Sequence, residues 1–249
     1  PIAVARCGAH TRASALAQRA KAASATVPAA PAAIIDGRPR CRAKTKRETI
    51  MAYYVINGGK RLEGSVTISG AKNAALAIIP ACILAGESCR LENLPRIEDV
   101  HVLEQILRMM GAGVEFTPDG GMRIDPKTIS TRHVTFDMVT RMRASYYLLG
   151  AMLGRYGYAE VALPGGCQIG QRPIDQHIKG FRALGADVSI QRGIITAKAD
   201  KLVGAEIYLD VVSVGATINI MLAAVCAEGK TIISNAAKEP HVVDTANFL

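Results

Sequence analysis

The amino-acid sequence predicts an α/β fold made of repeated βαβαββ units. From Gly64 onward, short apolar strands alternate with helix-length segments, and the order of the elements returns after about 70 residues. Similar short segments also open the second helix of each round: Ile97-Glu98-Asp99-Val100, Ile174-Asp175-Gln176 and Val242-Val243-Asp244-Thr245. A period of this length is too long for a solenoid repeat and suits a βαβαββ unit used three times.

The first round contains two helices and four short strands. Residues 97–110 place Ile, Val and Leu on one face of a helix, which Gly111 closes. Asp119-Gly120-Gly121 is typical of a hairpin turn. The predicted elements are the strand Ser65–Ser69, the helix Lys72–Ala85, the strand Cys89–Glu92, the helix Ile97–Met110 and the hairpin strands Val114–Phe116 and Met122–Ile124.

The second and third rounds repeat this order. Gly185 closes a helix as Gly111 does, and Arg192-Gly193 marks the second hairpin. The third round stops inside its second helix, so we expect the natural chain to continue beyond Leu249. The elements are helix Phe136–Arg155, strand Ala159–Leu163, helix Ile174–Leu184, hairpin strands Val188–Ile190 and Ile194–Ala197, strand Glu206–Leu209, helix Gly215–Ala227, strand Thr231–Ser234 and helix Val242–Leu249.

Composition excludes several classes of protein. The chain has 249 residues, 49% of them hydrophobic, which is enough for one large domain or two small ones. Its longest apolar run, Ala74 to Gly86, has 13 residues, where a membrane-spanning helix needs about 20. The six cysteines include no C-x-x-C pair and no His cluster accompanies them, so we expect no metal site. This cysteine usage fits a reducing compartment and a cytoplasmic location.

The positive charge is concentrated at the N-terminus. Residues 1–50 hold ten Lys and Arg against Asp36 and Glu48, so they carry +8 of the net charge of +9. The remainder is nearly neutral, which gives no reason to expect nucleic-acid binding.

Residues 1–50 have a foreign composition, with fifteen alanines and no sustained apolar period. We interpret them as upstream DNA read in frame, because Lys46-Arg47-Glu48 can be encoded by a ribosome-binding sequence just before Met51. An organellar transit peptide and a basic nucleic-acid arm are the alternatives. Each interpretation places these residues outside the fold.

The segment Ser69-Gly70-Ala71-Lys72-Asn73 joins a strand to a helix. Free N–H groups at the helix start, together with the Lys72 ammonium, suit a phosphate or a carboxylate. The alternative is a solvated lysine in the first helical turn. The spacing is not that of a nucleotide P-loop.

Cys167 lies in a loop with three Gly and two Pro, Leu163 to Pro173. A thiol in an exposed loop, five residues from Arg172, is better placed for chemistry than Cys82 or Cys226, which we expect inside apolar helices. The alternative is a thiol without a role.

Three further segments carry candidate binding groups. Arg143 lies near a helix start and has a guanidinium suited to phosphate or carboxylate, although a solvated helix face is the alternative. Arg172 to His177 opens a helix with Pro173 at its first position, and His177 is a candidate acid, base or positioning group. Val212 to Thr217 forms a strand-to-helix turn whose backbone amides could hold a ligand.

These segments, taken together, resemble the UDP-N-acetylglucosamine 1-carboxyvinyltransferase family of enolpyruvyl transferases. The resemblance runs in unbroken order from about Tyr54 to Leu249, and the Cys167 loop is its specific part. The sister family, 5-enolpyruvylshikimate-3-phosphate synthase, shares the fold but lacks this loop and typically has Lys-Ser where Lys72-Asn73 stand.

The resemblance implies roles for individual residues. Lys72 and Asn73 would contact phosphoenolpyruvate, and Arg143 would bind at the sugar-nucleotide site. Cys167 would donate a proton, form a covalent phosphoenolpyruvate adduct and react with fosfomycin. The implied UDP-sugar site comprises Arg172, Pro173, Ile174, Asp175, Gln176, His177, Val211, Val212, Ser213, Val214 and Gly215. Val211 is Lys in some relatives, and an apolar side chain removes one possible phosphate contact.

The resemblance also implies a reaction and a domain organisation. The enolpyruvyl group of phosphoenolpyruvate would pass to the 3-hydroxyl of UDP-N-acetylglucosamine without a metal or redox cofactor, starting peptidoglycan synthesis. Residues 64–249 would form most of one lobe, truncated in its third repeat, and residues 51–63 a strand of the other lobe. A catalytically inactive fragment that retains at most UDP-sugar binding is the alternative.

Overall fold

The computed structural model describes residues 61, 63–135, 139, 145–162 and 174–249. They fall into two units that divide between Ile68 and Ser69. In the first unit the described residues are exposed and form no helix or strand, and Arg61 pairs with Glu63 at 2.9 Å. The predicted strand Ser65–Ser69 is therefore wrong. Its alternating pattern lacks a partner strand among the described residues, which leaves Val66 88% exposed.

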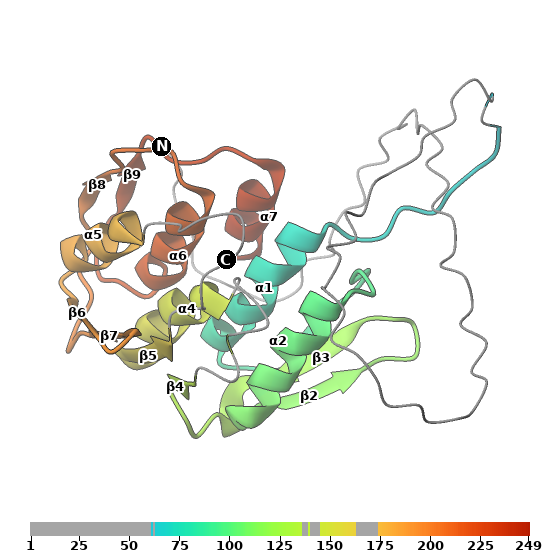
Figure 1. Ribbon diagram of the computed structural model, residues 1–249, viewed down its shortest axis with the longest axis horizontal. Helices are drawn as coiled ribbons and strands as arrows, with labels where there is room; N and C mark the ends of the chain where they lie inside the picture. The colour runs from blue at the N-terminus through green and yellow to red at the C-terminus, as the bar shows by residue number, and fades with distance from the viewer. Residues whose placement is uncertain (1–60, 62, 136–138, 140–144, 163–173) are drawn as a thin grey trace, which may run out of the picture. The chain divides into compact units, whose positions relative to one another are not determined.

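The first round of the second unit contains the predicted helices and hairpin. The elements of this round are α1 (Lys72–Ala85), β1 (Cys89–Leu91), α2 (Glu98–Met109), β2 (Gly113–Phe116), β3 (Met122–Asp125) and the short 3₁₀ helix η1 (Pro126–Thr128) (Figure 1). Strand β3 lies between β1 and β2 and is antiparallel to both. Gly111 ends the α2 segment at φ 98°, a conformation that glycine adopts readily.

The second round shows the complete βαβαββ order. Strand β4 runs parallel to β5, β5 is antiparallel to β7, and β7 pairs with β6. Arg192 and Gly193 both have positive φ, as a two-residue type I′ hairpin requires. The elements are β4 (His133–Val134), α4 (Tyr146–Tyr156), β5 (Tyr158–Ala162), α5 (Asp175–Ala183), β6 (Asp187–Gln191) and β7 (Ile194–Lys198). The start of the predicted helix Phe136–Arg155 lies largely outside the described residues.

The third round supplies β8 (Glu206–Tyr208), α6 (Val214–Ala224), β9 (Ile232–Ser234) and α7 (Pro240–Phe248). Strands β8 and β9 are parallel, as β4 and β5 are in the preceding round. The predicted βαβαββ repeat is therefore confirmed in the second round, while the first round lacks its first strand and the third has the order βαβα among the described residues.

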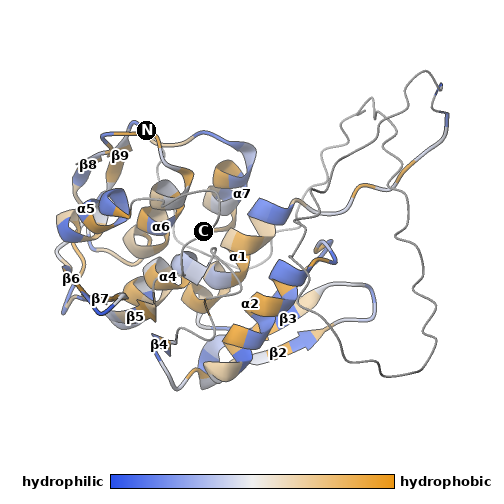
Figure 2. Ribbon diagram, viewed as in Figure 1, coloured by the Kyte–Doolittle hydropathy of each residue, from blue (hydrophilic) through white to orange (hydrophobic). Residues whose placement is uncertain are grey.

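The core is built around the first helix of each round. Helix α4 packs against both α1 and α6, and these helices bury nearly all their apolar side chains. Helices α2 and α5 are amphipathic, and the alternation of hydrophilic and hydrophobic residues along α2 is visible in Figure 2. The second helices therefore cover the core while the first helices form it.

Two glycines allow the close approach of helices to α6. A Cβ atom on Gly150 in α4 would overlap the backbone oxygen of Asn219. A Cβ atom on Gly180 in α5 would overlap the side chain of Ile220. Both neighbours are buried in a densely packed core, where displacement is costly.

Gly150→Ala is expected to lower the free energy of unfolding by about 1–3 kcal/mol, because the added methyl group must displace backbone atoms of α6. Urea unfolding of the purified chain measures this loss. Gly113→Ala is the matched control, because its Cβ would lie 3.5 Å from Asp125 Cβ, an ordinary contact. Equal effects of the two substitutions would contradict the packing argument.

Candidate functional site

The described residues place the predicted site residues in two groups. One group, Lys72 and Asn73, begins α1. The other combines the start of α5 with the loop that leads into α6. Arg143, Cys167, Arg172 and Pro173 lie outside the described residues.

Lys72 forms an ion pair with Asp99 at the start of α2. Lys72 Nζ lies 2.5 Å from Asp99 Oδ2, and the Lys72 side chain remains 56% exposed. Asn73 is also exposed. The preceding Gly70 packs so closely on the carbonyl of Asn93 that a Cβ atom would overlap it. The segment thus presents an accessible ammonium group at the start of a helix, with its charge balanced by a carboxylate.

Gln176 connects α5 to the segment after β8. Its Oε1 accepts a hydrogen bond from Asp210 N at 3.0 Å, and its Nε2 donates to Asp210 Oδ2 at 3.1 Å. Lys179 Nζ donates to the other carboxylate oxygen, Oδ1, at 2.6 Å. These hydrogen bonds, from Lys179 and then Gln176, hold the pKa of Asp210 below its usual value. The candidate loop after Asp210 is therefore anchored to the start of α5.

The segment from Val211 to Gly215 comprises the loop before α6 and the first two residues of that helix. Val211 and Val212 are 56% and 58% exposed. Ser213 caps α6, because its Oγ accepts a hydrogen bond from Ala216 N at 3.3 Å. The Ser213 hydroxyl thus has a structural partner, while the two valines present apolar side chains to solvent.

His177 is the buried member of the second group, only 7% exposed. Its Nδ1 lies 2.9 Å from Asn219 Nδ2 on α6, and its ring centroid is 5.9 Å from that of Tyr146. Burial lowers the pKa of His177 to about 4, and the opposing effect of Asp175 is smaller. The imidazole is therefore neutral at physiological pH. Ile174, which precedes α5, is partly buried against the core.

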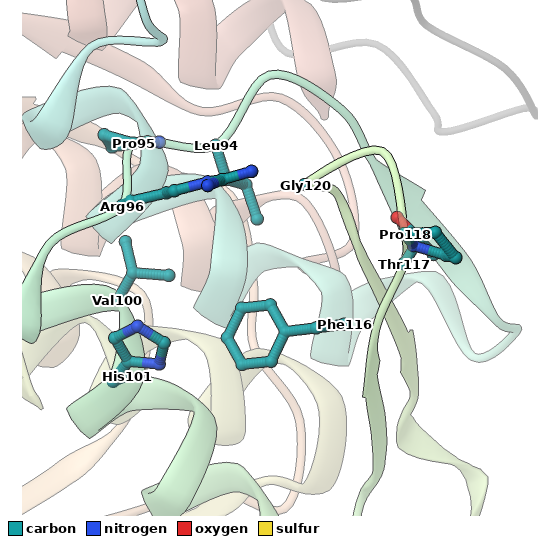
Figure 3. Close-up of a pocket in the computed structure, with 9 residues that line it drawn as sticks. All are labelled: Leu94, Pro95, Arg96, Val100, His101, Phe116, Thr117, Pro118 and Gly120. Carbon is teal, nitrogen blue, oxygen red and sulfur yellow. The ribbon is translucent and has the colours of Figure 1, made fainter.

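A pocket of about 230 Å³ lies elsewhere, between α2 and the β2–β3 turn (Figure 3). Phe116 and His101 lie in its wall, with ring centroids 5.1 Å apart, and Arg96 points toward Gly120. None of the predicted site residues lines this pocket.

Within the described ranges, no cluster of three or more His, Cys, Asp or Glu side chains could hold a metal ion. No described helix has the length and apolar character needed to cross a membrane. Cys82 is buried in α1 as expected, whereas Cys226 lies beyond the end of α6 and is exposed. The prediction that Cys226 lies inside an apolar helix is wrong because α6 ends at Ala224.

Comparison with known proteins decides the family. Residues 56–249 match the family described as EPSP synthase (3-phosphoshikimate 1-carboxyvinyltransferase). The chain belongs to the EPSP synthase family. Among solved structures, the enolpyruvyl transferase NikO from Streptomyces tendae is similar, with a TM-score of 0.66 and 25% identity over 77% of this chain and 45% of that one. EPSP synthase from Acinetobacter baumannii shares the fold, with a TM-score of 0.59 and 19% identity over 72% of this chain and 42% of that one.

The curated sequences that are similar to this chain are named for a different carboxyvinyl transfer from the one in the family description. A UDP-N-acetylglucosamine 1-carboxyvinyltransferase from Clostridium botulinum is 57% identical over 80% of this chain and 48% of its own length. A second one, from Bacillus subtilis, is 57% identical over 78% of this chain and 45% of its own. The chain thus spans about half the length of these relatives. The resemblance and the fold class predicted from the sequence are both confirmed.

Three residues that form hydrogen bonds or ion pairs with the candidate site residues were not predicted from the sequence. Asp99 appeared only as part of the repeated helix start, and no sequence signal links it to Lys72, because the two residues begin different helices. Asn219 is an amide within an apolar helix, a pattern that signals a buried hydrogen-bonding role. Asp210 directly precedes the candidate loop but became informative only through its bonds to Gln176.

The low pKa of His177 predicts a pH dependence of stability. The unfolded chain binds a proton near pH 6.5 and the folded chain only near pH 4, so stability is full above pH 6.5 and falls as the pH approaches 4. The shift corresponds to about 3 kcal/mol. Urea unfolding between pH 7 and 4.5 should show a steeper loss for the wild type than for His177→Gln, which stays neutral. Parallel pH profiles for the two proteins would refute a buried neutral histidine.

Proposed function

We propose that the whole protein transfers the enolpyruvyl group of phosphoenolpyruvate to the 3-hydroxyl of UDP-N-acetylglucosamine and releases phosphate. The observation that carries this proposal is 57% identity to proteins named for that carboxyvinyl transfer. The reaction would start peptidoglycan synthesis in the cytoplasm, and with it support cell-wall formation, cell shape and division. Its partners would be these two small molecules.

The site residues have proposed roles in this reaction. Lys72 and Asn73 would contact phosphoenolpyruvate, which is supported by the exposure of both side chains at the start of α1. Arg143 would bind at the sugar-nucleotide site, and Cys167 would supply the proton.

The second group would line the UDP-sugar site. The anchoring of the loop by Gln176 and Asp210 supports this, because it brings the start of α5 and the start of α6 to one place. The proposed lining consists of Arg172, Pro173, Ile174, Asp175, Gln176, His177, Val211, Val212, Ser213, Val214 and Gly215.

The residue types fit the bond changes. As the sugar hydroxyl oxygen bonds to the enol carbon of phosphoenolpyruvate, the hydroxyl O–H bond breaks, and the methylene carbon gains a proton from Cys167. The C–O bond to phosphate then breaks, and phosphate carries away the proton that the hydroxyl lost. A methyl proton returns to the Cys167 thiolate, which restores the double bond. Both substrates are anions, so Lys72 and the arginines would neutralise them and hold them in register.

A binding-only function is the second candidate for the 249-residue chain. It is favoured by the observation that the chain spans 48% of the Clostridium botulinum relative. On this proposal, residues 64–249 form most of one lobe, residues 51–63 belong with the other, and residues 1–50 lie outside the fold. The chain would then bind the UDP-sugar without turnover.

Phosphate release from both substrates separates the two candidates. If the 249-residue chain itself carries the transferase activity proposed for the whole protein, its release should be at least about 100-fold above that of Cys167→Ser, because a positioned proton donor contributes about that factor or more. A coupled phosphate assay measures the rate. Release equal to that of Cys167→Ser, with UDP-N-acetylglucosamine still bound, would assign the chain the binding-only function.

Binding of UDP-N-acetylglucosamine tests the second group directly. Gly215→Ala is expected to weaken binding about tenfold, or roughly 1.4 kcal/mol. The added Cβ would lie 3.2 Å from His177 Nε2 and push the loop and imidazole apart. Isothermal titration calorimetry measures the dissociation constant, with Gly113→Ala as the matched glycine control. Unchanged affinity in Gly215→Ala would remove this loop from the proposed site.

A further inference from the structure

Asn219 is a fully buried amide in a helix that is otherwise almost entirely apolar. Its Oδ1 accepts a hydrogen bond from Gly150 N at 2.7 Å, and its Nδ2 donates to the carbonyl of Tyr146 at 2.8 Å. These α4 groups are four residues apart, the spacing of a helical hydrogen bond. The carboxamide of Asn219 therefore spans one turn of α4.

These two contacts fix the orientation of the amide. A flipped carboxamide would place its NH₂ group against the N–H of Gly150 and its oxygen against the carbonyl of Tyr146, so both bonds would be lost. Nδ2 is thus the atom that faces His177 Nδ1 at 2.9 Å. Because an amide nitrogen donates and cannot accept, His177 Nδ1 must accept, and the ring proton belongs on Nε2.

His177 Nε2 faces the start of α6. A Cβ atom on Gly215 would lie 3.2 Å from Nε2 and 3.3 Å from Cε1, so a larger residue there would crowd this side of the ring. The titratable groups around the ring are Asp175 on its own helix and Tyr146 on α4. The contacts from α6 come from the uncharged Asn219 and Gly215.

We propose that Asn219 is a positioning residue that holds His177 as the neutral Nε2–H tautomer and directs that N–H to the first turn of α6. The site then receives a fixed hydrogen-bond donor for an oxygen of the bound ligand, and His177 does not act as a base through Nε2. The assignment of that ligand as a UDP-sugar rests on the proposed function, whereas the tautomer does not.

Nuclear magnetic resonance of the ¹⁵N-labelled 249-residue chain tests the tautomer without any ligand. Long-range ¹H–¹⁵N correlations distinguish the two ring nitrogens, and His177→Gln identifies the His177 signals by their loss. The expected result is a proton on Nε2 and an unprotonated Nδ1 from pH 5.5 to 8. A proton on Nδ1 in the wild type would overturn the proposal, whether or not any Asn219 variant folds.

Asn219→Asp supplies the second arm. A carboxylate in contact with Nδ1 should draw a proton to that nitrogen and raise the apparent pKa of His177 by about one unit or more. Asn235→Asp is the matched control, because Asn235 Nδ2 donates to the carbonyl of Leu209 at 2.8 Å and not to the imidazole. A folded Asn219→Asp protein with an unchanged His177 tautomer and titration would also overturn the proposal.

Titration with UDP-N-acetylglucosamine separates this inference from the proposed function. Binding that shifts the His177 Nε2–H signal supports the donor role, and binding that leaves it unshifted overturns that role. If the UDP-sugar does not bind while the wild type shows the Nε2–H tautomer, the proposed substrate is wrong and the positioning of His177 by Asn219 is upheld.

Discussion

The structure depends on burying helices that are apolar on almost every side. An amphipathic helix can lie on a surface, but α1 and α6 expose apolar groups in all directions unless other elements surround them. Helix α4 packs between them, and the strands and amphipathic helices of each round form the outer cover. Each βαβαββ unit therefore places one helix in the core, and the N-terminus of that helix is available to candidate site residues. The candidate residues Lys72 and Ser213 lie at such ends.

The same constraint explains why polar side chains of the site are held by buried amides. Helices α4 and α6 pack closely at Gly150 and leave room for few atoms between them. Any polar group buried there therefore needs a hydrogen-bond partner in a defined position. Asn219 and Gln176 meet this need in different ways. Asn219 lies between two core helices, whereas Gln176 joins a covering helix to a loop. Local order at the candidate site thus comes from the core through Asn219 and from the covering helix α5 through Gln176.

Much of the fold could be predicted from the sequence because its patterns are local. Helix α1 has the predicted bounds, since a long apolar segment ends at Gly86, which adopts a left-handed conformation. Strand β4 was missed because two residues are too few for a period to appear. The segment Ser65–Ser69 has the alternation of apolar and polar residues that is typical of a strand, but this pattern does not show whether a neighbouring strand is present to pair with it. The ion pair of Lys72 with Asp99 joins separate helices, so only the folded chain could show it. Arg143 and Cys167 stay predictions, carried by the resemblance.

The ion pair between Lys72 and Asp99 has a consequence for selectivity among anions. Before any ligand arrives, the two side chains together carry no net charge, so this end of α1 exerts little long-range attraction on anions. An incoming anion must compete with a carboxylate already 2.5 Å from the ammonium group. A singly charged carboxylate that displaces Asp99 from Lys72 gains little, because it offers the ammonium group the same charge. A phosphorylated carboxylic acid offers a higher charge and more acceptor oxygens. On the proposed role of Lys72, the pair would therefore favour anions of higher charge density by a modest margin, because an exposed ion pair is worth only about 0–1 kcal/mol.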